Sequence, residues 1–183
     1  MTQAIHATLV GHLDNPQGYV ERVGVTLLQK ADGSLKLAYA IHCPAALMCI
    51  PTREAPAPDE ALWQTTCCEF FVAADGSDGY REFNFSPSGQ WAAYDFATYR
   101  QPLTGAPPPP APLLWSGYQD GCLRLDASLM PSALPAGRHL RCALAVIVEW
   151  HDGGLGYWAL AHPEGKPDFH HPACFTLALA RPA

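Results

Sequence analysis

Two short segments combine acidic, amide and apolar residues in a pattern that could hold a polar ligand. In the segment 80–86 (YREFNFS), Glu82 and Asn84 fall on one side of an extended chain, and two phenylalanines fall on the other. In the segment 66–72, Glu69 lies between a cysteine and a phenylalanine on one side. A few acids and amides on a sheet face suit a shallow groove for a polar ligand. The alternative is a solvated face whose acids and amides hydrogen-bond to loop backbone.

Small residues on neighbouring segments strengthen the groove interpretation. Alternation in the segment 34–43 places Ala38 and Ala40 on its second face, and alternation in 138–150 does the same for Ala143 and Ala145. Large side chains on these faces would fill the space that a ligand needs. The sequence therefore predicts a sheet face that is acidic in places and otherwise small.

Aromatic residues provide the second half of such a site. Sugar rings stack their apolar faces on tryptophan or tyrosine, while charged and amide groups bind the hydroxyls. Trp63 follows a polar stretch and precedes the acidic segment, so we expect it to be an exposed platform. Trp158 is also included among the candidate ligand contacts. For either tryptophan, packing in the core is the alternative role.

A third cluster lies near the C-terminus, in the segment 162–171 (HPEGKPDFHH). Its histidines and acid, above all Asp168 and His170, are candidate ligand contacts. Imidazole and carboxylate groups also bind zinc and related ions, although this spacing matches no metal motif. A tightly folded structural loop is the remaining interpretation, because prolines and glycine interrupt the segment.

Catalytic signatures are sparse, and the sequence predicts no catalytic residue and no resident cofactor. Ser86 and Ser88 do not form the Gly-x-Ser-x-Gly turn that exposes a nucleophile. No glycine-rich phosphate loop is present. The remaining enzymatic hypothesis is a glycoside hydrolase that uses Glu69 and Glu82 as its carboxylate pair.

The elements that must position these residues are predicted to be short strands. Eighteen prolines and fifteen glycines interrupt the chain, and alternation of period two persists between them. This pattern predicts an all-β fold, an antiparallel β-sandwich of the jelly-roll or immunoglobulin-like kind, forming one domain over residues 1–183. The proline-rich segment 106–112 is expected to be a stiff crossover between strands. The eleven predicted strands are 6–13, 23–29, 34–43, 66–72, 80–86, 91–96, 113–118, 121–125, 138–150, 156–160 and 173–179.

Composition excludes several classes of partner. The 183 residues are 49% apolar and 15% charged, with 11 lysines and arginines against 17 acids and a formal charge of −6. Nucleic acid is not expected as a partner, because its binding depends on clustered cations. The sequence shows no secretory signal and no apolar run long enough to cross a bilayer. Seven cysteines, an odd number, favour free thiols in the cytoplasm.

Several strings in the sequence resemble a known family. They are 62–71 (LWQTTCCEFF), 80–91 (YREFNFSPSGQW), 96–100, 157–160 and 162–170. Together they resemble the bacterial DOMON-like proteins, which are related to family 9 carbohydrate-binding modules. The resemblance extends from the first strand to about residue 179, nearly the whole chain.

The resemblance implies a non-catalytic β-sandwich that binds a saccharide or a similar polar molecule. By position, it implies that Trp63, Glu69, Asn84 and Arg100 contact the ligand. Secreted modules usually carry an acidic pair where this chain has Thr65–Thr66. That departure argues against anchoring to cellulose or xylan and favours a soluble sugar or metabolite.

A haem-binding module is the main alternative that the resemblance suggests. Haem-binding DOMON domains use methionine and histidine as axial ligands. In this chain Met48 would have to pair with His170 or His171. Bound calcium is a further alternative, and the sequence does not address the oligomeric state.

Overall fold

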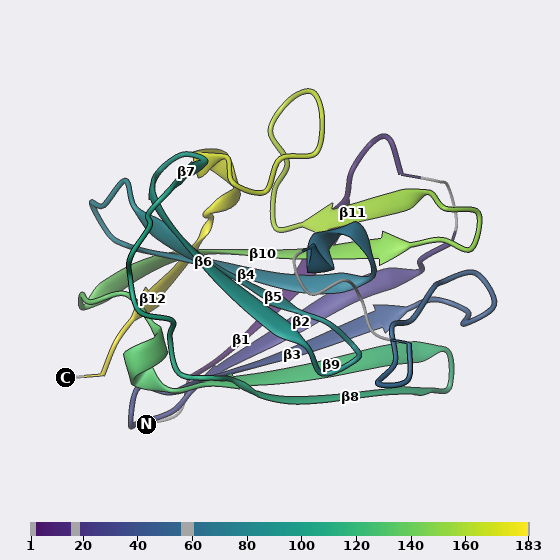
Figure 1. Cartoon of the computed structure of the whole chain (residues 1–183), viewed down its shortest axis with the longest axis horizontal. Coiled ribbons are helices and arrows are strands. Elements are labelled where there is room, and N and C mark those ends of the chain that lie inside the picture. Colours follow the sequence, from purple (N-terminus) through teal and green to yellow (C-terminus); the bar gives the residue numbers. More distant parts are fainter. Residues whose placement is uncertain (1–2, 16–18, 56–60, 183) are drawn as a thin grey trace.

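The computed structural model describes residues 3–15, 19–55 and 61–182, and in these residues the chain forms twelve antiparallel strands and three short 3-10 helices (Figure 1). The all-β prediction is confirmed. The strands are β1 (Gln3–Gly11), β2 (Arg22–Gln29), β3 (Leu35–His42), β4 (Cys67–Ala74), β5 (Tyr80–Phe85), β6 (Trp91–Thr98), β7 (Gln101–Pro102), β8 (Leu113–Gln119), β9 (Cys122–Leu129), β10 (His139–Glu149), β11 (Leu155–Ala159) and β12 (Leu177–Ala180). The 3-10 helices are η1 (Leu62–Gln64), η2 (Pro131–Ala133) and η3 (Pro172–Cys174).

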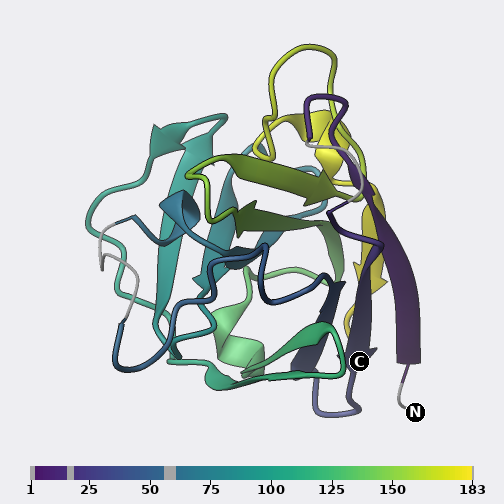
Figure 2. The same cartoon turned by 90° about the vertical axis from the view of Figure 1, so that its right-hand side faces the viewer.

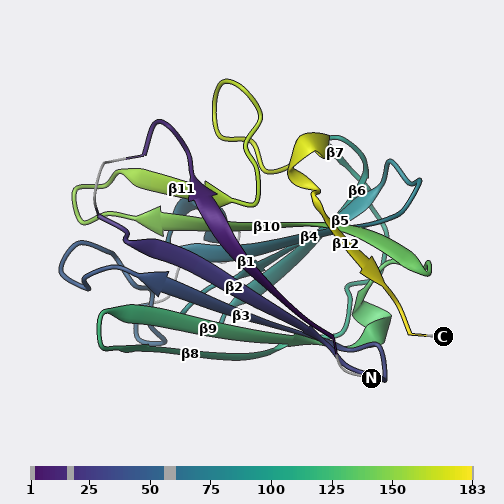
Figure 3. The same cartoon turned by 180° about the vertical axis from the view of Figure 1, so that it is seen from behind.

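All the strands join in one hydrogen-bonded ladder that divides into two halves at β1. The order is β7-β6-β5-β4-β10-β11-β1-β2-β3-β9-β8, and β12 pairs with β10. Residues 3–9 of β1 pair with β2, whereas Val10 and Gly11 pair with β11. We call the β8-β9-β3-β2-β1 half sheet 1 and the half that contains β4–β7 and β10–β12 sheet 2. Sheet 1 faces the viewer in Figure 3, and β5 and β6 of sheet 2 lie in front in Figure 1.

The core lies between the two sheets and follows the predicted alternation. In β3, every second residue from Leu35 to Ile41 is buried, and the residues between are only partly covered. In β10, Leu140, Leu144 and Val148 belong to the same cluster. Apolar burial of this kind is the main favourable contribution to folding. The sandwich is therefore held by the period-two pattern of its strands.

Sheet 2 differs from sheet 1 because its outer face is also covered. Seven consecutive residues of β4, Cys67–Ala73, are buried, although their side chains alternate between two faces. A second apolar cluster, which includes Phe71, Ala145 and Phe169, lies on this outer face. Phe169 comes from the segment between β11 and β12, which folds over the sheet. The loop at the start of this segment projects beyond the sheets in Figures 1 and 2.

Hydrogen bonds to β1 fix this projecting loop. His162 Nε2 lies 2.8 Å from the carbonyl oxygen of Val10, and His12 Nε2 lies 3.0 Å from that of Gly165. The structural role considered for the segment 162–171 is thus correct for His162. The later residues of the segment, including Phe169, cover the outer face of sheet 2.

The structure corrects several details of the predicted elements. β7 was not predicted, since it has two exposed residues and no pattern. The last strand begins at Leu177 rather than at residue 173, because Pro172–Cys174 form η3, capped by the side chain of His171. Ala38 and Ala40 lie on β3 in sheet 1 and therefore do not adjoin the acidic segments.

The proline-rich segment 106–112 does connect strands, as expected. It joins β7 to β8, which form the two opposite ends of the ladder. Its residues are mostly exposed. In the described residues, no helix has the length and apolar character needed to cross a membrane.

Candidate functional site

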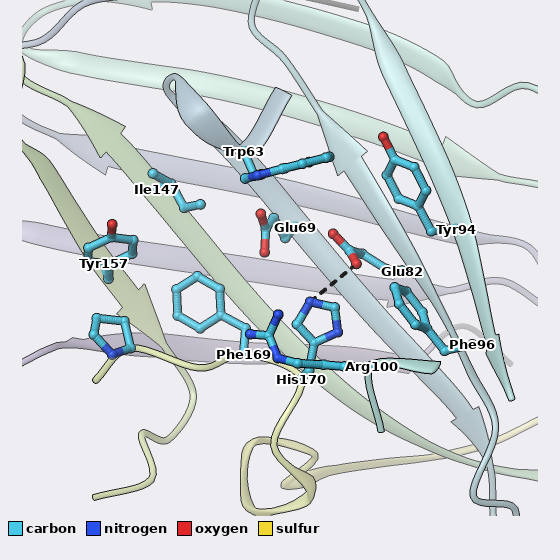
Figure 4. A pocket seen from close by; sticks show the side chains of 11 residues that line it. Trp63, Glu69, Glu82, Tyr94, Phe96, Arg100, Ile147, Tyr157, Phe169 and His170 are labelled. Atoms are coloured by element: carbon cyan, nitrogen blue, oxygen red, sulfur yellow. Dashed lines mark ion pairs between the residues drawn. The ribbon is translucent and has the colours of Figure 1, made fainter. Parts of the chain in front are cut away.

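A cavity of about 360 Å³ opens on the outer face of sheet 2 (Figure 4). Its floor is formed by strands of the sheet, and its walls come from η1, the β6–β7 turn and the segment 162–171. Figure 4 shows the two carboxyl groups at its centre, with aromatic rings around them. The lining residues are Trp63, Glu69, Glu82, Tyr94, Phe96, Arg100, Ile147, Tyr157, Pro167, Phe169 and His170.

Strand register explains why two acids share the floor. Glu69 on β4 lies opposite Asn84 on β5, and Glu82 lies opposite Phe71. The two acids are therefore diagonal neighbours on one face of the sheet. On its other side, Glu69 lies opposite Ala145 of β10, whose small side chain leaves the space above the floor open.

The Glu69 carboxyl has no hydrogen-bond partner among the described residues. The residue is only 3% exposed, and its carboxyl points into the cavity (Figure 4). Burial raises its pKa well above the usual range, the nearby Glu82 raises it further, and Arg100 opposes both effects. The Glu69 carboxyl faces the cavity without a hydrogen bond from the described residues, so it is available to bind a polar group of a ligand.

The Glu82 carboxyl, unlike that of Glu69, accepts a hydrogen bond from a neighbouring side chain. Asn84 donates from Nδ2 to Glu82 Oε1 over 2.8 Å, and Asn84 Oδ1 accepts from the Cys67 thiol at 3.8 Å. Burial raises the pKa of Glu82 to about 7, while the Asn84 hydrogen bond and Arg100 work in the opposite direction. The carboxyl is thus oriented, and it titrates near neutral pH.

His170 completes a chain of hydrogen bonds beside Glu82. The backbone N–H of Arg100 donates to the Tyr80 hydroxyl at 3.1 Å, and this hydroxyl is hydrogen-bonded to His170 Nδ1 at 2.8 Å. The other ring nitrogen of His170, Nε2, lies 3.6 Å from Glu82 Oε2. Burial lowers the pKa of His170 to about 4, and Arg100 lowers it further against the effect of Asp168. The contact with Glu82 is therefore one between a neutral imidazole and a carboxyl group, and not an ion pair.

Arg100 lies in the two-residue turn between β6 and β7. Its φ of 53° is in the left-handed region, which few residues other than glycine adopt. The guanidinium Nη2 donates to Asp168 Oδ1 at 2.8 Å, and the Tyr99 hydroxyl donates to Asp168 Oδ2 at 2.5 Å. Asp168 therefore ties both turn residues to the segment that covers the sheet.

Aromatic rings surround the two carboxyl groups. Trp63 is 39% exposed and meets Tyr94 edge to face, with ring centroids 5.8 Å apart. On the other side of the cavity Tyr157 meets Phe169 at 6.1 Å. Such rings offer flat apolar surfaces to a ligand whose polar groups reach the carboxyls.

The structure brings most of the predicted site residues together. Trp63, Glu69, Glu82, Arg100 and His170 line the cavity. Two further candidates lie beside the lining residues and hold them in place. Asn84 orients Glu82, and Asp168 binds Arg100.

Trp158 is not at the cavity. It lies in the core between the sheets, where its ring meets Trp150 edge to face at 6.0 Å. Its neighbour Tyr157 lines the cavity instead, because adjacent residues of a strand point to opposite faces.

The sequence interpretation also missed several lining residues. Tyr94 and Phe96 alternate along a predicted strand, and this shared face was a usable signal. Pro167 and Phe169 carried no comparable signal, because only tertiary folding places their segment over sheet 2.

Geometry does not support the haem ligand pair. Met48 is buried in the core between the sheets, whereas His170 lies on the outer face of sheet 2 and His171 caps η3. No described group of three or more histidine, cysteine or acidic side chains is arranged to hold a metal ion.

Comparison with known proteins gives structural matches without sequence matches. No protein-family model matches the chain, and no curated protein matches its sequence. One similar structure is that of a protein from Bacteroides uniformis ATCC 8492 that is proposed to bind carbohydrate. It is 18% identical, with a TM-score of 0.70, and the match covers 96% of this chain and 85% of that one.

A second similar structure is a family 9 carbohydrate-binding module from Caldicellulosiruptor kristjanssonii in complex with cellotriose. It is 8% identical, with a TM-score of 0.62, and the match covers 88% of this chain and 75% of that one. At such identities the likeness establishes the shared sandwich fold alone.

Proposed function

We propose that this protein binds a saccharide, without catalysis, in the cavity on the outer face of sheet 2. The observation that carries the proposal is the buried Glu69 carboxyl, which points into an aromatic-lined cavity and lacks a partner in the described chain. A ligand hydroxyl or a related polar group would supply that partner.

The cavity matches a small sugar in size and chemistry. Its volume of about 360 Å³ is at the lower end of the range for small-molecule sites. Trp63, Tyr94 and Tyr157 offer ring faces or edges, while Glu69 and Glu82 offer groups that bind hydroxyls. The fold shared with a module that binds cellotriose is consistent with this use.

Two parts of the sequence interpretation remain within the proposal. We retain a DOMON-like relation, which rests on the quoted strings alone. We also retain a cytoplasmic location, which rests on seven unpaired cysteines.

A glycoside hydrolase is the second candidate, because Glu69 and Glu82 share one cavity and have different surroundings. Hydrolysis of aryl glycosides by the purified protein would test it. Turnover that disappears in both Glu69→Gln and Glu82→Gln would replace the binding role with an enzymatic one.

Ligand-dependent stability tests the main proposal. The purified protein would be melted with monosaccharides and disaccharides, and a sugar at a hundred times its Kd should add about 2.7 kcal/mol of stability. Trp63→Ala should weaken binding of that sugar by about tenfold or more, since it removes a partly exposed ring from the wall. Trp115→Ala is the matched control, because Trp115 is 57% exposed on β8 of sheet 1. Equal binding by wild type and Trp63→Ala, or no stabilisation by any sugar, would contradict the proposal.

A further inference from the structure

We infer that the ligand of this cavity carries an ammonium group, as an amino sugar does. The inference rests on the proposed function and makes its ligand class narrower. It follows from the balance of charge in the cavity and from the kind of side chain that surrounds the two acids.

Acids outnumber cations at this site. Glu69 and Glu82 both face the cavity, and Arg100 is the one lysine or arginine among its described lining residues. Arg100 already donates to Asp168 at 2.8 Å, so its charge is balanced by a carboxylate outside the floor. The hydrogen bond with Tyr80 keeps His170 Nδ1 occupied, and burial keeps the imidazole neutral. Among the described lining residues, Arg100 is therefore the one cation near the two acids, and they share it with Asp168.

The surrounding rings favour an organic cation over a metal ion. Trp63, Tyr94, Phe96, Tyr157 and Phe169 line the same cavity. The faces of such rings attract ammonium groups, and several rings together form the usual cage for alkylated ammonium ligands. A calcium or magnesium ion would instead need six or more oxygen ligands, and the floor offers two carboxyls.

Glu69 is positioned to bind the ligand ammonium group directly. Glu69 is only 3% exposed and its carboxyl lacks a hydrogen-bond partner in the described residues, so a ligand ammonium would both hydrogen-bond to it and neutralise it once it is ionised. Glu82 is oriented by Asn84 beside it and can accept a second hydrogen bond from the ammonium group. A neutral hydroxyl could hydrogen-bond to the two acids but would bring no positive charge to them.

The test compares three sugars of the same ring: glucosamine, glucose and N-acetylglucosamine, by calorimetry at pH 7. We expect glucosamine to bind at least about tenfold more tightly than the other two. Its binding should also release protons, seen as a heat that changes with the ionisation enthalpy of the buffer, because the acids must ionise to meet the ammonium. Glucose binding should release none.

Glu69→Gln should reduce the preference for glucosamine over glucose to about threefold or less. The matched control is Glu21→Gln, because Glu21 is an exposed acid just before β2, and this variant should keep the full preference. Glucose or N-acetylglucosamine binding as tightly as glucosamine would overturn the inference and leave the proposed function standing. If neither these three sugars nor any other saccharide binds, both the inference and the proposed function are overturned. Displacement of glucosamine by millimolar calcium would overturn the inference in favour of a metal site.

Discussion

At the scale of residues, the two acids of the cavity show how environment separates chemically identical groups. Glu82 receives an amide hydrogen bond and faces a neutral imidazole, whereas Glu69 receives no hydrogen bond from the described chain. In both, burial is the largest cause of a raised pKa. Folding therefore favours the protonated form of each acid. When the pH rises enough to ionise them, the folded protein loses stability relative to the unfolded chain.

Glu82→Gln tests this cost. The pKa of Glu82 rises from 4.5 in the unfolded chain to about 7 in the folded protein, so the unfolded chain binds fewer protons between these pH values. The contribution of Glu82 to stability is present below pH 4.5 and is lost as the pH rises through 7. Glutamine does not ionise, so the variant should gain stability relative to wild type between pH 5 and pH 8, on the order of 3 kcal/mol. Urea unfolding at a series of pH values would measure this difference.

Stability must be compared between wild type and Glu82→Gln, because in wild type His170 changes stability with pH in the opposite direction to Glu82. Its pKa falls from 6.5 to about 4 on folding, so its contribution is lost as the pH falls from 6.5 through 4. Below pH 6.5 the effects of Glu82 and His170 on the stability of wild type partly cancel. Because His170 is present in both proteins, the difference in stability between wild type and Glu82→Gln reports Glu82 alone. A constant difference from pH 5 to pH 8 would show that Glu82 is not held protonated. Glu21→Gln provides the baseline for an exposed acid.

At the scale of elements, β11 must place Tyr157 at the cavity and Trp158 in the core. Gly156 makes this packing possible, because a Cβ there would lie 2.7 Å from Trp158 Cη2 and Cζ3 and 2.8 Å from Trp150 Cζ2. Both tryptophans are buried, so neither ring can move away freely. The strand can therefore pass the two rings only with glycine at this position.

Gly156→Ala should consequently destabilise the protein by about 1–3 kcal/mol, the usual range for an overpacked core. It should also weaken sugar binding, because β11 carries Tyr157 into the cavity. Gly24→Ala on β2 is the control, since its Cβ would lie 4.0 Å from the nearest atom and should cost less than 1 kcal/mol. Equal stability of the two variants, measured by urea unfolding, would contradict this account of β11.

Asp168→Asn tests the connection between the β6–β7 turn and the covering segment. The substitution keeps the shape of the side chain but removes the charge that accepts from Tyr99 and Arg100. Because Arg100 is half exposed, we expect a small loss of stability, about 1 kcal/mol or less. Sugar affinity should fall severalfold, since Phe169 and His170 lie on the segment that loses its anchor. Calorimetric titration with a sugar that stabilises the wild-type protein against melting would measure the change. Unchanged affinity would show that Asp168 does not position Phe169 and His170 in the cavity wall.

The elements also show where sequence reasoning ends. Alternation predicted the strands and correctly separated Glu82 and Asn84 from their neighbouring phenylalanines, because a strand has only two faces. It could not decide whether Tyr157 or Trp158 faces the core, since a register change of one residue exchanges them. The pairing of Trp158 with the core residue Val146 decides it, and that pairing depends on the whole sheet. The same limit explains Ala38 and Ala40, whose face was predicted but whose sheet was not.

At the scale of the whole molecule, the single ladder implies that the two sheets unfold together. β10 pairs with β4 along one edge and with β11 and β12 along the other, so it holds sheet 2 together. β1 then joins this sheet to sheet 1 by pairing with β11 and β2. Opening either sheet would break the contacts that close the other, which favours one cooperative transition.

The seven cysteines can report this cooperativity, because they lie in both sheets, in η3 and in the connection that follows β3. In the native protein, six are buried and only Cys49 is partly exposed. Burial, Glu149 and Asp152 raise the pKa of Cys49, so a thiol reagent at pH 8 should modify this one cysteine, and more slowly than a free thiol. The other six should react at one common rate that follows global unfolding in urea. Cys49→Ser should abolish the early reaction and leave the common rate unchanged. Early modification of Cys67 or Cys174 would instead show that the outer face of sheet 2, with its cavity, opens independently of the core.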